Sequence, residues 1–137
     1  MYKRQGSGNY YAYPTEGDAE GWAYRTDLVE DPAEMAAFAA AYGYEYSVPP
    51  KDYNEFVDMA EFFSRPDDGL YGAAVYTQVD YDAITMGFEN AQFTYGCEWN
   101  DNFQVDGVLN TPECVEALEA YKAVSYTHLT LPTTPYV

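Results

Sequence analysis

Trp99 stands in a loop whose other residues are all polar, Glu98-Trp99-Asn100-Asp101-Asn102. An aromatic face can pack on the C–H face of a sugar ring, and carboxylates and amides can exchange hydrogen bonds with the sugar hydroxyls. This combination makes Trp99 a candidate stacking platform. The alternative is that Trp99 anchors the loop by folding onto the core, and the residues alone leave both interpretations open.

A second polar group follows residues 70–76, an apolar segment that we predict to be a buried strand. Gln78, Asp80, Tyr81 and Asp82 lie between this segment and a predicted helix. In open α/β sheets, ligands bind at the carboxyl ends of the strands, so these side chains are candidate ligand-binding residues. The alternative is that Asp80 or Asp82 only caps the helix that follows.

The strongest structural pattern is a capped amphipathic helix within residues 49–64. Two prolines precede Asp52, which occupies the N-cap position, and Glu55 follows three residues later, at the spacing of a capping box. Apolar residues then recur at helical spacing and predict one buried face: Tyr53, Phe56, Val57, Ala60 and Phe63.

Further helices and strands alternate along the chain. Helices are predicted to begin near Pro32, near Asp82 and at Pro112, and strands are predicted at residues 10–14 and 22–25 in addition to 70–76. Residues 97–109 are expected to form a hairpin-like excursion that turns at Asp106-Gly107. Alternating strands and helices predict an α/β fold. Trp22 and Tyr24 are expected to lie in its core.

Composition restricts the functional class. The chain has 137 residues, room for one domain, and a formal net charge of −17 from 23 acidic and 6 basic residues. Such a charge disfavours nucleic acid and anionic membrane surfaces as partners. No apolar run is long enough to cross a membrane. We therefore expect no nucleic-acid partner and no membrane insertion.

Both ends of the chain resemble translated DNA adapters. Residues 1–5 correspond to GTG TAT AAG AGA CAG, the end of an adapter used in transposase-based library preparation. Residues 124–137 correspond to the reverse complement of the same arm, followed by an index and a final valine codon. We therefore interpret residues 1–5 and 124–137 as adapter-derived scars and residues 6–123 as a metagenomic insert, an internal piece of a longer protein.

This interpretation changes the available chemistry. The chain's one histidine, His128, falls in a scar, so the insert has no histidine for base catalysis or metal binding. No metal or cofactor motif is present, and none is predicted. Cys97 and Cys114 could form a disulfide if the protein is exported. Because Cys114 falls on an apolar helix face, a buried thiol is favoured.

Taken in order, the segments of residues 10–123 resemble the extracellular solute-binding proteins of carbohydrate ABC transporters, the family that includes maltose-binding protein. The similar stretches are 10–14, ending in Pro14; Trp22 to Leu28; Pro49 to Phe56; Gly69 to Tyr76; and Leu109 to Glu113 running on to Lys122. The chain departs from the family at Asp52 and Tyr53, where Thr and Trp are commoner, and at Cys97, where a glycine is usual.

The resemblance implies part of a periplasmic-binding-protein type II fold. Residues 10–22 would form the hinge crossing and residues 23–123 most of the second lobe. Glu16 and Asp18, in the hinge turn, would then lie near sugar hydroxyls, although a plain solvated turn is an equal alternative. The 97–101 loop would border the ligand cleft.

The family further implies a non-enzymatic role, the capture of an oligosaccharide or polyol for an ABC importer. Its partners would be the carbohydrate and the transporter permease subunits. The location would be the periplasm or the outer face of the membrane, with a lipoprotein anchor. The alternative is a secreted carbohydrate-active enzyme such as a glycoside hydrolase, which needs a carboxylate pair at a defined separation. The acids are instead spread along the chain.

Overall fold

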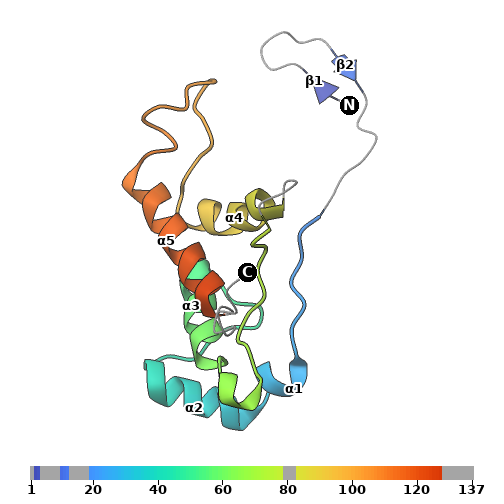
Figure 1. Ribbon diagram of the computed structural model, residues 1–137, viewed down its shortest axis with the longest axis vertical. Coiled ribbons are helices and arrows are strands. Elements are labelled where there is room, and N and C mark those ends of the chain that lie inside the picture. The colour runs from blue at the N-terminus through green and yellow to red at the C-terminus, as the bar shows by residue number, and fades with distance from the viewer. Residues whose placement is uncertain (1, 4–9, 13–18, 79–82, 128–137) are drawn as a thin grey trace, which may run out of the picture.

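The computed structural model describes residues 2–3, 10–12, 19–78 and 83–127, and most of its regular structure is helical (Figure 1). Strands β1 (Tyr2–Lys3) and β2 (Tyr10–Ala12) pair in an antiparallel two-stranded sheet. The helices follow in this order: α1 (Thr26–Val29), α2 (Pro32–Tyr42), α3 (Tyr53–Phe62), the 3₁₀ helix η1 (Pro66–Asp68), α4 (Ala83–Thr94) and α5 (Pro112–Thr127).

The predicted α/β fold, a partial periplasmic-binding-protein type II fold, is wrong, because the described part of the chain is mainly helical. Residues 22–25 and 70–76, predicted to be strands, belong to no sheet in the described residues. Within them, Leu70 alone forms an isolated bridge, with Arg65. A strand needs a neighbour that pairs with its N–H and C=O groups. A groove separates these two segments, so their backbones do not pair in a β-ladder.

The predicted capping box at the start of α3 is confirmed, with one change of partner. The Glu55 backbone N–H donates to Oδ1 of Asp52 at 2.9 Å, as an N-cap requires. The Glu55 carboxylate reaches back past Asp52, and its Oε2 accepts from the Lys51 backbone N–H at 2.6 Å. Both interactions fix where the helix begins.

The predicted starts of α2 and α5 are also confirmed. Asp31 Oδ1 accepts from the Ala33 N–H at 2.8 Å, Pro32 is the first helical residue, and Gly43 ends α2 with φ +81°. That left-handed backbone conformation favours glycine. Helix α5 begins at Pro112, as its Asn-Thr-Pro-Glu start predicted.

Two hydrophobic clusters form the core, and α3 contributes to both. The first joins α3 to α4 and α5 and contains Tyr53, Phe56, Ala60, Ala91, Tyr121 and Val124. The second joins α3 to α2 and to the loop after it, and contains Phe38, Tyr46, Met59 and Phe63. In Figure 1, α3 accordingly lies beside the lower part of α5, with α2 across its lower end.

The C-terminal helix passes the predicted adapter boundary at residue 124. Helix α5 continues to Thr127, and Val124 is fully buried in the first cluster. At the other end, β1 lies within predicted scar 1–5 and pairs with β2. The division of the chain into scars and insert stays a prediction, but residues assigned to a scar take part in the fold.

Cys97 and Cys114 form a disulfide, so the expectation of a buried thiol at Cys114 is wrong. The expectation correctly placed Cys114 in the interior, where it is 5% exposed. It missed that Cys97 at the end of α4 is buried beside it. The bridge therefore joins the end of α4 to the first turn of α5 and closes the intervening loop.

Gly72 is required by a close approach between the 70–76 segment and α3. A Cβ at position 72 would lie 1.8 Å from the Ala60 carbonyl oxygen, which is backbone and cannot rotate away. We predict that Gly72→Ala lowers the free energy of unfolding by about 2 kcal/mol, because the segment must lift off α3. Gly21→Ala is the control, because nothing lies within 4 Å of its added Cβ. Equal denaturation midpoints for the two variants would contradict the contact.

The disulfide closes a loop with a sequence separation of 17 residues. From the entropy of closing such a loop, we predict that the double variant Cys97→Ala/Cys114→Ala loses about 3 kcal/mol of unfolding free energy. Urea denaturation measures this loss. Dithiothreitol should destabilise the wild type to a similar degree and leave the double variant unchanged, whereas an insensitive wild type would show that no bridge forms.

Candidate functional site

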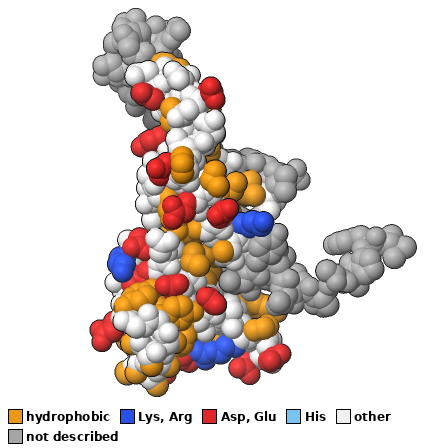
Figure 2. Space-filling model, turned by 90° about the vertical axis from the view of Figure 1, so that its left-hand side faces the viewer, with side chains coloured by type: hydrophobic (Ala, Val, Ile, Leu, Met, Phe, Trp, Pro, Cys, Tyr) orange, Lys and Arg blue, Asp and Glu red, His pale blue; other side chains and the backbone are white. Residues whose placement is uncertain are grey.

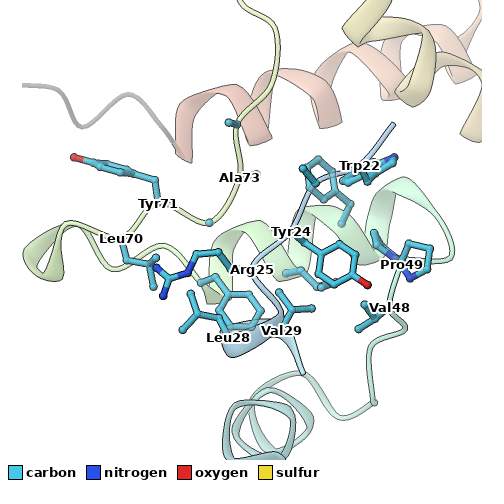
Figure 3. Close-up of a pocket in the computed structure, with 17 residues that line it drawn as sticks. Trp22, Tyr24, Arg25, Leu28, Val29, Val48, Pro49, Leu70, Tyr71 and Ala73 are labelled. Atoms are coloured by element: carbon cyan, nitrogen blue, oxygen red, sulfur yellow. The ribbon is translucent and has the colours of Figure 1, made fainter. Parts of the chain in front are cut away.

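A pocket lies in the groove between residues 22–25 and the 70–76 segment, with α3 beneath it (Figure 3). Its volume is about 460 Å³, in the range of small-molecule sites. Four parts of the chain form its walls: residues 22–25, α1, the 48–50 loop and residues 70–74. Its floor consists of Phe56, Met59 and Phe63 from α3 and its C-cap.

Two half-exposed aromatic side chains stand on one wall of this pocket. Trp22 meets the Phe56 ring edge to face, with the ring centroids 4.3 Å apart, and remains 49% exposed. Tyr24 is 47% exposed, and its hydroxyl donates to Glu30 Oε1 at 3.5 Å. In Figure 3 both side chains lie on the side of Val48 and Pro49, whereas Tyr71 points away from them. Trp22 and Tyr24 therefore give the wall aromatic surface that no core residue covers.

The charged residue of the pocket lining is neutralised within its own segment. Arg25 donates to Asp27 through both Nε, at 3.1 Å to Oδ1, and Nη2, at 2.5 Å to Oδ2. This fork holds the pKa of the Asp27 carboxyl below its usual value and raises the pKa of Arg25. Because Asp27 balances the charge of Arg25, the pocket suits a neutral ligand better than an ion.

A second pocket of about 340 Å³ continues the groove toward α4. It shares Trp22, Ala23, Phe56 and Ala74 with the first pocket. Its far wall is more polar, because it contains Glu20 and Asn90 of α4. The Asn90 side chain donates a hydrogen bond to the Glu20 carboxylate. Trp22 thus lies where an apolar and a polar compartment meet.

Most of the sequence-predicted site residues lie outside the described residues. This holds for Glu16, Asp18, Asp80, Tyr81 and Asp82, on whose roles the structure gives no test. Gln78 is described and exposed, and it lines neither of the two pockets.

Trp99 is anchored to α4 rather than open on both sides. Its Nε1–H donates to Glu89 Oε1 at 3.1 Å, and its ring lies edge to face with Phe88, centroids 6.4 Å apart. Of the two interpretations that the sequence left open, this geometry matches the loop anchor. Trp99 is partly exposed and lines neither pocket, so the structure does not bring it together with Trp22. Its role in binding stays a prediction.

The sequence prediction assigned the pocket aromatics Trp22 and Tyr24 to the core, and here it was wrong. A signal was present, because alternate residues of an extended segment point to the same side, which places these two rings together. What could not be seen was that no sheet forms over them.

Comparison with known proteins gives no further guidance: no family model, no curated protein and no solved structure matches this chain. Within the described residues, no group of three or more His, Cys, Asp or Glu side chains is arranged to hold a metal ion. In the same part of the chain, no helix combines the length and apolar character needed to cross a membrane.

The anchoring of Trp99 can be measured by removing its donor alone. Trp99→Phe keeps an aromatic ring and loses the hydrogen bond to Glu89, so we predict a loss of about 1 kcal/mol in unfolding free energy. Trp22→Phe is the matched control and should change stability by less than about 0.5 kcal/mol, because Trp22 is half exposed. Equal urea midpoints for the two variants would contradict the anchoring role.

Proposed function

We propose that this chain binds a neutral carbohydrate, an oligosaccharide or a polyol, in the groove beside Trp22. The observation that carries the proposal is the pairing of two half-exposed aromatic rings with a pocket of about 460 Å³ whose one lining cation is already matched by Asp27. Exposed aromatic rings beside a concave surface suit the C–H faces of sugar rings. An uncharged ligand would leave the Arg25–Asp27 pair intact.

Capture of substrate for an ABC importer, with permease subunits as partners, is the wider role that we propose. It is supported by the order of the sequence motifs and not by the fold, since the helical structure removes the two-lobed framework that the resemblance implied. The disulfide supports an oxidising location, such as the periplasm or the outer face of a membrane.

The proposal also assigns a non-catalytic role to the groove. Glycoside hydrolysis uses two carboxyl groups on either side of the scissile bond. Among the described residues, the larger pocket is lined by no Asp or Glu and the smaller one by Glu20, which is bonded to Asn90.

Calorimetric titration with a panel of neutral sugars and polyols tests the proposal. We expect at least one to bind, and Trp22→Ala to weaken that binding by about tenfold, the loss of one stacking contact of about 1.4 kcal/mol. Phe93→Ala is the control, because Phe93 is an exposed aromatic outside both pockets.

Three outcomes would count against the proposal. If no sugar binds, the groove is not a carbohydrate site. If Trp99→Ala weakens binding and Trp22→Ala does not, the sugar lies at the 97–101 loop. If sugar is cleaved during the titration, as product analysis would show, the enzymatic alternative is correct.

A further inference from the structure

Residues 97–114 form a loop that projects beyond the body of the molecule, and we call it the disulfide arm. The bridge between Cys97 and Cys114 closes its base. In Figure 1 the arm, drawn in yellow to orange, reaches past the ends of α4 and α5, away from α2. It lies apart from the groove, because none of its residues lines either pocket. The arm is therefore separate from the groove in which the sugar is proposed to bind.

The outer part of the arm is held by several hydrogen bonds. Asp101 and Gln104 exchange two backbone bonds, of 2.9 and 2.8 Å, around a two-residue turn. Asn100 Oδ1 accepts from the Phe103 N–H at 3.2 Å, and farther along Asn110 Oδ1 accepts from the Gly107 N–H at 2.7 Å. The predicted turn at Asp106-Gly107 is present, because the Val108 N–H donates to the Val105 carbonyl oxygen at 3.0 Å, but the two-residue hairpin turn, Asn102-Phe103, lies four residues earlier. Because the arm is already ordered, little conformational freedom remains to be lost on binding.

Phe103 at the tip is unfavourable for the isolated chain in two separate ways. Its φ is +70° and that of Asn102 is +48°, the left-handed pair of a type I′ turn, in which glycine is preferred at the second position. A bulky side chain in that region is strained. The side chain is also 77% exposed and so gains little from burial. A strained residue kept on a rigid surface loop motivates a functional explanation.

The charge of the arm indicates what kind of surface would receive this side chain. Residues 97–114 contain no Lys or Arg and four acidic residues, all exposed: Glu98, Asp101, Asp106 and Glu113. A neighbouring apolar side chain, Val105, is 50% exposed. Aromatic residues at the centre of a contact, surrounded by charges complementary to the partner, are typical of protein interfaces.

We propose that the disulfide arm is a docking element, in which Phe103 inserts into an apolar pocket bordered by Lys or Arg side chains on a partner protein. The proposal commits to a basic protein surface, because the acidic border of the tip would repel an acidic one.

The test uses the full chain as bait and a phage-displayed library of disulfide-cyclised peptides as the probe. We expect enriched peptides that combine Lys or Arg with apolar residues, and we expect Phe103→Gly to weaken their binding at least tenfold. Phe93→Ala removes another exposed aromatic, 54% exposed on α4, and should leave binding unchanged. Raising the salt concentration from 50 to 500 mM should also weaken binding, since the charges lie at a solvated rim.

A thermal melt gives a second readout that a purely structural role would not produce. Phe103→Gly should raise the melting temperature by about 4 °C, because glycine relieves the backbone strain. Loss of binding together with a gain in stability supports a docking role. The proposal is overturned if no peptide is enriched, if the enriched peptides bind Phe103→Gly as tightly as the wild type, if salt leaves binding unchanged, or if the variant is less stable than the wild type.

Discussion

Helix α3 is the element on which the rest of the structure depends. One face of this helix supplies Tyr53, Phe56 and Ala60 to the cluster with α4 and α5, and Met59 and the C-cap residue Phe63 belong to the cluster with α2. A helix that serves two cores must begin at a fixed residue, since a shift by one position would turn both faces away. The hydrogen bonds of Asp52 and Glu55 set that start. They therefore also determine the position of the groove floor, which α3 and its C-cap form.

The elements that could be predicted from sequence are those with a local signal. The bounds of α2 follow from Asp31, Pro32 and Gly43, and the start of α5 follows from Pro112, because caps and prolines act within one turn of the backbone. The buried face of α5 follows less well from its apolar residues, since Ala117 and Tyr121 are buried whereas Leu118 is 56% exposed. Which side of a helix is covered depends on neighbours that are distant in sequence.

The fold class failed for the same physical reason. Residues 22–25 and 70–76 have the composition of strands, but strand formation requires a pairing partner, and composition cannot supply one. Once the sheet is absent, aromatic residues expected in its core become the walls of a groove. The error over Trp22 and Tyr24 is therefore a consequence of the error in topology and not a separate failure. The disulfide was left open because the proximity of Cys97 and Cys114 depends on how α4 meets α5.

The acidity of the chain is distributed and does not define a site. Figure 2 shows Asp and Glu side chains scattered over the visible face, with few Lys or Arg side chains among them. Like charges spread in this way keep a protein soluble but weaken its compact state. Ion pairs also link separate segments, as when Arg65, which follows α3, binds Glu34 of α2 through two hydrogen bonds of 2.8 and 2.5 Å. The groove is then one of the places where apolar contacts rather than charge set the chemistry.

The contact at Gly72 has a consequence for how this groove can change. Here the main chain of one wall touches the main chain of the floor at Ala60 without an intervening side chain. The depth of the groove at that point is therefore set by backbone atoms and not by the side chains that line it. Side chains that line the groove can be exchanged to alter polarity and shape while this dimension is retained. A scaffold of this kind separates the geometry of a binding surface from its selectivity, so that the two can vary independently.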